Sequence, residues 1–195
     1  MSGDTLDLGP QALIVARLAQ GVTEEQLGGV TPCPEYAVHN VLGHLAGLAV
    51  AFRDAGRKDL GPTTDTSPST AVPDIEPGWR EALPKALDEL AEAWRDPAAW
   101  TGRTRAGGVS LPGAVAAAVA ADELVVHGWD LARATGQAYE PDAAALQASY
   151  GFLAAAAEDP STDGGIFGPV VSVPDDAPLL DRVIGLSGRD PGWKP

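Results

Sequence analysis

Residues 111–136 read LPGAVAAAVAADELVVHGWDLARATG, and they set the architecture of the chain. From Pro112 to Ala121 no position carries a charge, which is typical of a helix that is buried on every face. Gly136 follows as a helix stop signal. The pattern predicts a central helix over about Leu111 to Thr135 in an all-α fold.

Three ionisable side chains lie on one face of this apolar helix. Glu123 and His127 are four positions apart, which places them within about 40° of each other around the axis. Asp130, seven positions after Glu123, returns to the same stripe. Burying a carboxylate without a partner costs several kcal/mol, so this stripe needs cations or a metal ion.

A second helix is predicted to begin at Pro34, to have Glu35 in its first turn, and to run to about Arg53. Apolar residues three positions before and four positions after His44 turn this histidine at least partly inward. If the two helices pack side by side, His44 meets Glu123 and His127. Two imidazoles and one carboxylate, with a fourth position open, form the ligand set of a catalytic zinc or a related divalent ion.

The same residues have alternative explanations. Asp130 would orient a ligand histidine or a bound water beside a metal, but it would be structural if it paired with Arg133. His44 alone is typical of a hydrogen-bonded core histidine, and Glu123 with His127 of an ordinary i,i+4 contact. Residue chemistry leaves the metal site and a purely structural polar cluster equally open.

The remaining pattern predicts one domain over residues 1–195. A first helix is expected over about Leu8–Ala19, a third over Gly78–Arg95, a hairpin over 100–111, a fifth helix over Pro141–Ala157, an extended piece over 165–174, and a short helix over Leu179–Leu186. Residues 55–77 hold four prolines and form an expected mobile surface connection. The segment 160–195 is an extended and helical tail.

Charge and length limit the possible partners. The net charge of −14 would repel phosphate backbones and anionic membrane surfaces, so no nucleic-acid or membrane partner is expected. No apolar run reaches transmembrane length, and the acidic N-terminus is unlike a signal peptide. We expect a cytoplasmic protein, with a homodimer left open.

One cysteine excludes an intramolecular disulfide and any multi-cysteine metal site. Cys33 lies where the second helix is predicted to begin, and the helix dipole would lower its pKa and make it reactive. Packing under the loop is the simpler role. His39 is expected at the surface, and Trp129 in the core or in a pocket wall.

Two motifs and the C-terminal segment resemble a known family. The stretches TPCPEYAVHNVLGHLAGL (31–48), ADELVVHGWDLARATGQ (121–137) and LLDRVIGLSGRDPGW (179–193) are similar to short, single-domain actinobacterial members of the mycothiol-dependent maleylpyruvate isomerase N-terminal family, in the DinB-like superfamily. The resemblance implies a DinB-like four-helix bundle, ordered up-down-down-up, with a small hairpin and a decorated tail.

The resemblance also implies a zinc or nickel ion at the open end of the bundle, held by His44, Glu123 and His127, with Asp130 important for activity. The isomerase itself has a second domain that contributes a substrate-binding arginine. We expect this chain, which ends at Pro195, to lack that domain. The metal site would remain, but the chain would not isomerise maleylpyruvate.

Three functions follow as hypotheses. In the first, a metal-bound thiolate, with mycothiol as co-substrate, attacks a small electrophile in a transferase or isomerase reaction, and Asp130 is the catalytic residue that positions the thiol or exchanges a proton. The second is a non-catalytic, metal-dependent small-molecule binding or stress protein. The third is a metal-assisted hydrolase that activates water.

Overall fold

The computed structural model describes residues 5–67, 71–159 and 168–195. Four long helices make up its centre. They are α1 (Gly9–Gln20), α2 (Val38–Arg57), α4 (Trp79–Arg95) and α6 (Gly113–Thr135). None of the helices in these three ranges combines the length and the apolarity that a membrane span requires.

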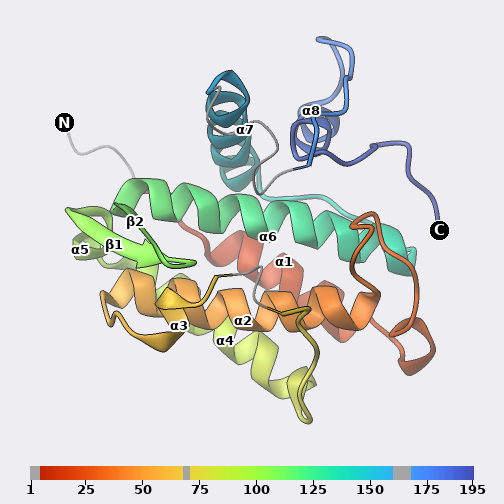
Figure 1. The fold of residues 1–195 in the computed structure, drawn as a ribbon. Coiled ribbons are helices and arrows are strands. Elements are labelled where there is room, and N and C mark those ends of the chain that lie inside the picture. The colour runs from red at the N-terminus through yellow and green to blue at the C-terminus, as the bar shows by residue number, and fades with distance from the viewer. Residues whose placement is uncertain (1–4, 68–70, 160–167) are drawn as a thin grey trace.

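The four long helices form a bundle. Each of α1 and α2 packs against both α4 and α6. Helices α1 and α6 run in one direction and α2 and α4 in the other, which is the predicted up-down-down-up order (Figure 1). The all-α bundle with a small hairpin and a tail is therefore confirmed.

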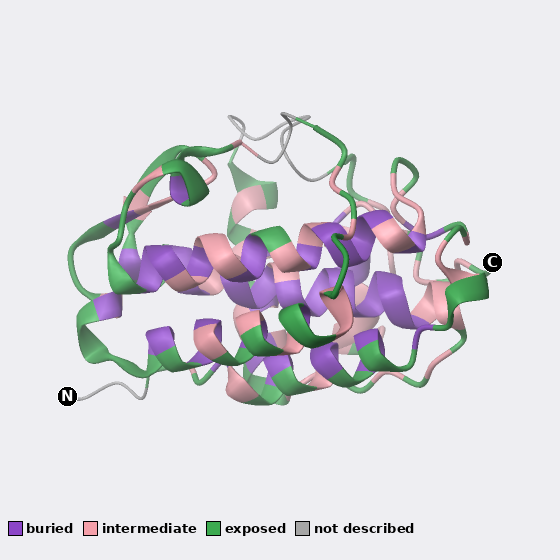
Figure 2. Cartoon of the chain, turned by 90° about the horizontal axis from the view of Figure 1, so that it is seen from below, coloured by how far each residue is buried: buried purple, intermediate pink, exposed green. Residues whose placement is uncertain are grey.

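Helix α6 is buried along most of its length, as its uncharged first half predicted. It contacts α1 and α2 within the bundle and α7 (Ala143–Glu158) outside it. In Figure 2 the buried segments run along the middle of the helices, and the exposed ones lie mainly in the surrounding loops. Because the helix has apolar neighbours on several sides, its few polar side chains must find partners inside the protein.

The hairpin closes one end of the bundle. Strands β1 (Arg103–Ala106) and β2 (Val109–Pro112) pair antiparallel, with Ala106 opposite Val109. Both turn residues, Gly107 and Gly108, have positive φ angles of 58° and 79°. A two-residue turn of this kind needs φ above zero at both positions, which is why the Gly-Gly pair predicted the hairpin.

Two further helices follow the bundle. Helices α7 and α8 (Leu179–Leu186) pack against each other, and α7 packs on α6. The bounds of α8 are those predicted. Of the expected extended piece over 165–174, residues 165–167 lie outside the described part, and residues 168–174 form no strand.

The connection expected over 55–77 is more structured than its composition suggested. Helix α2 continues to Arg57, and the short helices α3 (Pro62–Asp65) and, after α4, α5 (Pro97–Trp100) cap the same end of the bundle. Further on, the chain crosses α2 so closely that a Cβ at Gly43 would lie 2.4 Å from the Asp74 backbone. The parallel arrangement of α2 and α4 requires this crossover.

The predicted start of the second helix was wrong. Residues before the helix form a separate turn in which the Thr31 hydroxyl donates to the carbonyls of Tyr36 (2.6 Å) and Cys33 (3.0 Å). The Asn40 side chain accepts from the Ala37 backbone N–H at 2.9 Å, so α2 begins at Val38. A capping side chain and a stable turn thus outweighed the proline signal at position 34. A 3₁₀ helix, η1 (Glu24–Gln26), precedes this turn.

Candidate metal centre

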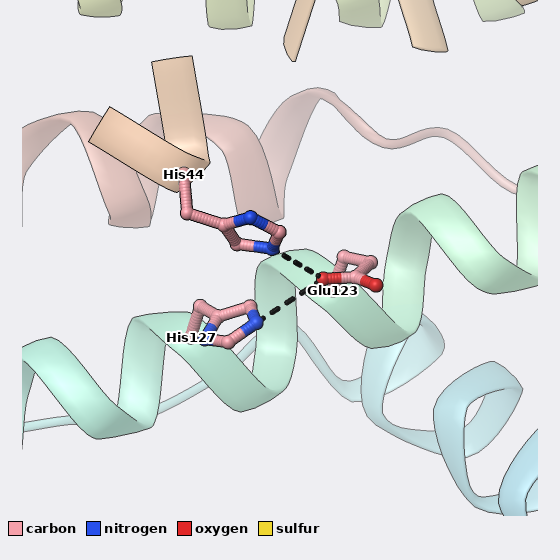
Figure 3. A group of neighbouring side chains, drawn as sticks. All are labelled: His44, Glu123 and His127. Atoms are coloured by element: carbon pink, nitrogen blue, oxygen red, sulfur yellow. Dashed lines mark hydrogen bonds and ion pairs between the residues drawn. The ribbon is translucent and has the colours of Figure 1, made fainter. Parts of the chain in front are cut away.

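The structure brings His44, Glu123 and His127 together between α2 and α6. Each offers one ligand atom, and these atoms all lie within 4.8 Å of one another. The Nε2 atoms of His44 and His127 lie 3.1 and 3.2 Å from the same oxygen, Oε2 of Glu123. Figure 3 shows both imidazoles turned toward this carboxylate. His44 comes from α2, whereas Glu123 and His127 come from α6.

Helix geometry explains this convergence. Glu123 and His127 are one turn apart on α6, so they face the same neighbour. That neighbour is α2, where His44 lies between the buried residues Gly43 and Leu45. The two imidazole rings meet edge to face, with centroids 4.5 Å apart.

Asp130 lies behind the cluster. Its Oδ2 atom is 3.0 Å from Nδ1 of His127, and its side chain is completely buried. Of the two roles considered for Asp130, this position supports the one of orienting a histidine. A carboxylate on the far nitrogen of a histidine fixes the ring and its tautomer, as in many metal sites.

The charges around His127 depend on a proton. Burial lowers the pKa of His127, but hydrogen bonds to Asp130 and Glu123 outweigh burial and raise that pKa to about 9. Burial likewise raises the pKa of Glu123, but hydrogen bonds from His127 and His44 outweigh it, so that the pKa is well below its ordinary value. Carboxylates at both ring nitrogens favour the protonated form of His127, whose positive charge would balance Glu123.

These residues fit a divalent cation. Two imidazole nitrogens and one carboxylate oxygen are a suitable donor set for zinc or nickel. The Glu123 and Asp130 carboxylates on either side of His127 make the cluster attractive to positive charge, and the 22% exposure of the Glu123 side chain leaves one side accessible. A cation there would take the place of protons on the Nε2 atoms.

Two side chains of the turn before α2 lie near the cluster. The Tyr36 ring centroid is 5.8 Å from that of His44. Burial, followed by the nearby Asp130 carboxylate, raises the pKa of the Cys33 thiol. Of the two roles considered for Cys33, this finding does not support a thiol activated by a helix dipole, because α2 begins five residues later.

The tail supplies a residue that sequence reasoning missed. Arg189 places Nε 3.3 Å from Oδ1 and Nη2 3.0 Å from Oδ2 of Asp130. The suggested Asp130–Arg133 pair was wrong, since Arg133 donates to the Trp193 carbonyl at 2.7 Å and lies over the Trp129 ring. Arg189 is 59 positions from Asp130, a separation at which no local spacing rule applies.

Other polar residues take no part in the cluster. Asp122 faces α7, where the Ser149 hydroxyl donates to it at 2.6 Å, and burial raises the Asp122 pKa to about 7. His39, partly exposed, contacts Asp74 at 2.7 Å. Trp129 is buried, as expected. Asp122 was overlooked because it adjoins Glu123 but points about 100° away around the helix.

A helical bundle with a two-histidine, one-carboxylate cluster defines a class of candidate metalloproteins. The chain belongs to the family described as the mycothiol maleylpyruvate isomerase N-terminal domain, which matches residues 9–132. The match includes α1, α2, α4 and the cluster residues. It ends before α7, α8 and Arg189.

The chain is also similar in sequence to two bacterial proteins. Two Mycobacterium tuberculosis proteins, from two strains and both described as uncharacterized, are 28% identical over 128 residues, which is 65% of this chain and 64% of theirs. The match thus spans less than two thirds of those actinobacterial relatives.

Solved structures show the same fold. The mycothiol-dependent maleylpyruvate isomerase superimposes with a TM-score of 0.66 at 17% identity, over 95% of this chain and 88% of that one. A histidine-to-alanine mutant of that isomerase gives a TM-score of 0.56 at 17% identity, over 75% and 66% of the two chains. The first likeness therefore includes the tail as well as the bundle.

Proposed function

We propose that this protein is a metal-dependent enzyme that uses a low-molecular-weight thiol, mycothiol, to isomerise or conjugate a small electrophile. The convergence of His44, Glu123 and His127 on one point is the observation that carries the proposal. Membership of a family named for a mycothiol-dependent isomerase supports the choice of thiol.

Each residue has a defined task in this proposal. His44, Glu123 and His127 hold a zinc or nickel ion, which when bound lowers the pKa of a thiol at its open position. Asp130 keeps Nδ1 of His127 protonated and its Nε2 directed at the ion. Asp130 therefore acts by orienting a ligand, since its complete burial keeps it away from substrate.

The thiol chemistry balances in both reaction types. In isomerisation the sulfur adds to one carbon of a double bond and leaves after rotation, so the thiol is regenerated. In transfer the sulfur displaces a leaving group and stays on the product. Tyr36, beside His44, lies near enough to the cluster to contact a bound thiol or electrophile.

The first test is elemental analysis of tag-free protein. We expect about one equivalent of divalent metal in the wild type and none in His44→Ala, because two ligands hold an ion far less tightly than three. The matched control is His39→Ala, a histidine of the same helix that contacts Asp74 outside the cluster. Circular dichroism would establish that both variants are folded.

The control decides how the result is interpreted. Metal retained in His39→Ala and lost in His44→Ala would support the site. A wild type without metal that takes up neither zinc nor nickel would overturn the proposal and leave the three residues as a structural polar cluster.

A second test addresses the thiol. Metal-loaded protein would be assayed with mycothiol and either 1-chloro-2,4-dinitrobenzene, for conjugation, or maleylpyruvate, for isomerisation. Thiol-dependent conjugation of 1-chloro-2,4-dinitrobenzene is the expected result, whereas thiol-dependent isomerisation of maleylpyruvate would overturn the expectation that this chain does not catalyse that reaction. Hydrolysis of an ester without thiol would favour a hydrolase, and metal binding without turnover in any assay would favour a binding protein.

A further inference from the structure

The C-terminal tail reaches the cluster through one side chain. Arg189 follows α8, and its guanidinium lies in the interior with 14% of the side chain exposed. Its Nε and Nη2 atoms face the two oxygens of Asp130, and Nη1 donates to the Ser187 carbonyl at 2.9 Å. This two-point contact fixes the plane of the carboxylate, which a single hydrogen bond would not do.

The backbone before Arg189 is built to deliver it there. Gly188 has a φ angle of +78°, and a Cβ at this position would lie 3.1 Å from the Gly168 backbone. The Arg189 N–H donates to the Ile184 carbonyl at 3.0 Å, and the Val171 N–H to the Gly185 carbonyl at 2.9 Å. These hydrogen bonds hold the C-terminal end of α8 in place, and they therefore fix the backbone position from which the Arg189 side chain extends.

The contacts continue without a gap from the tail to the cluster. Arg189 holds Asp130, and Asp130 accepts from Nδ1 of His127. The opposite nitrogen of His127 then faces Glu123. Any rotation of the Asp130 carboxylate would release the His127 ring, because that carboxylate is its contact on the Nδ1 side.

We propose that Arg189 is a positioning residue of the metal centre, which acts through Asp130 to fix the ring orientation and tautomer of His127. This inference rests on the proposed metal centre and extends it to the tail, beyond residues 9–132. Arg189 itself need not touch the metal or the substrate. Its effect is to preorganise one of the three ligands.

The test compares two arginines of the tail. Arg189→Gln removes the contact to Asp130, whereas the control Arg182→Gln removes a contact between α8 and Tyr150 of α7. We expect zinc affinity, measured by competition with a chromophoric chelator, to fall about 10–100-fold in Arg189→Gln. Arg182→Gln should bind zinc as the wild type does, and Arg189→Lys, which keeps the charge, should recover part of the loss.

A second readout does not depend on the metal. In ¹H–¹⁵N spectra of metal-free protein, the Nδ1 proton of His127 should exchange slowly with water in the wild type and faster in Arg189→Gln. Asp130→Asn and the double variant should show equal zinc affinities, because Arg189 acts through Asp130.

The outcomes separate this inference from the proposed function. A wild type that binds no zinc would overturn the metal centre. The exchange rate of the His127 Nδ1 proton would still test the contacts from Arg189 through Asp130 to His127. Wild-type affinity and exchange in Arg189→Gln, an equal loss in Arg182→Gln, or additive effects of the Asp130 and Arg189 substitutions would overturn the positioning role. If Arg189→Gln does not fold, the comparison of Arg189→Lys with Arg182→Gln decides.

Discussion

Two polar clusters in this bundle hold buried carboxylates in different ways. Near the hairpin, Asp54 accepts from Arg53 Nε at 2.8 Å and from the Thr63 hydroxyl at 2.7 Å. At the candidate metal centre, the ion-pair partners of Glu123 among the described residues are the imidazoles of His44 and His127.

The difference lies in whether the countercharge can leave. Arg53 is protonated at any pH in which the protein folds, so Asp54 is balanced permanently. The charge that balances Glu123 exists only while an imidazole holds a proton, and a metal ion can replace that proton. The Asp54 cluster therefore stabilises the fold, whereas the Glu123 cluster, under the proposed function, would exchange a proton for a metal ion.

The largest expected effect is a loss of metal binding confined to one cluster. Glu123→Gln removes the anionic ligand. Loss of a residue that only hydrogen-bonds a metal ligand weakens binding by at most roughly 100-fold, and the loss of Glu123 should weaken zinc binding by more than that. Asp54→Asn should leave the affinity unchanged. Chelator competition measures both, and similar affinities in the two variants would remove the distinction between the clusters.

The next effect concerns pH. Because hydrogen bonds raise the pKa of His127 to about 9, in spite of burial, zinc must displace a proton below that pH. Zinc affinity should therefore rise with pH, by about tenfold per unit between roughly pH 7 and 9. Calorimetry in buffers of different ionisation enthalpy should detect about one proton released per ion. Binding without proton release would contradict the exchange of cations.

A smaller effect is expected on stability at the hairpin cluster. Asp54→Ala should lower the free energy of unfolding by about 2 kcal/mol, the range for hydrogen bonds to a charged group. Burial raises the pKa of Asp54, but hydrogen bonds from Arg53 and Thr63 outweigh burial, so that the pKa lies below its ordinary value. The stabilisation is therefore complete above the ordinary pKa and is lost on acidification. Urea unfolding at pH 7 and pH 3 tests this: a pH-independent difference between variant and wild type would contradict it.

The smallest effect is expected at Cys33. Burial and the Asp130 carboxylate raise the pKa of its thiol, so it should react with iodoacetamide more slowly than free cysteine at pH 7. Cys33→Ser should retain the wild-type metal content. Rapid alkylation, or metal loss in Cys33→Ser, would make this thiol part of the centre.

The helices were predictable where periodicity was strong. The uncharged run before Ala121 identified α6 as central, and the spacing of Glu123, His127 and Asp130 placed them on one face. The start of α2 was not predictable in the same way. Pro34 is a good first helical residue, but the same segment can also form the turn held by Thr31. The sequence does not indicate which of the two structures is more stable.

The partners of the site residues were harder to foresee than the residues themselves. Spacing rules favoured Arg133, three positions from Asp130, but the tail brings Arg189 there across 59 positions. Such a contact depends on how α8 packs against α7, and no helical period encodes that packing. The motif around Arg189 marked a resemblance without indicating what its arginine contacts.

The ligands on α2 and α6 are separated by 79 positions in the chain. An ion bound to His44 and Glu123 would close a loop that contains the crossover, α4 and the hairpin. In the chain-entropy view, closing a loop of this length disfavours the unfolded chain by roughly 4–5 kcal/mol. The ion would then act as a removable cross-link, and a chelator would lower the melting temperature of the whole bundle without altering any side chain.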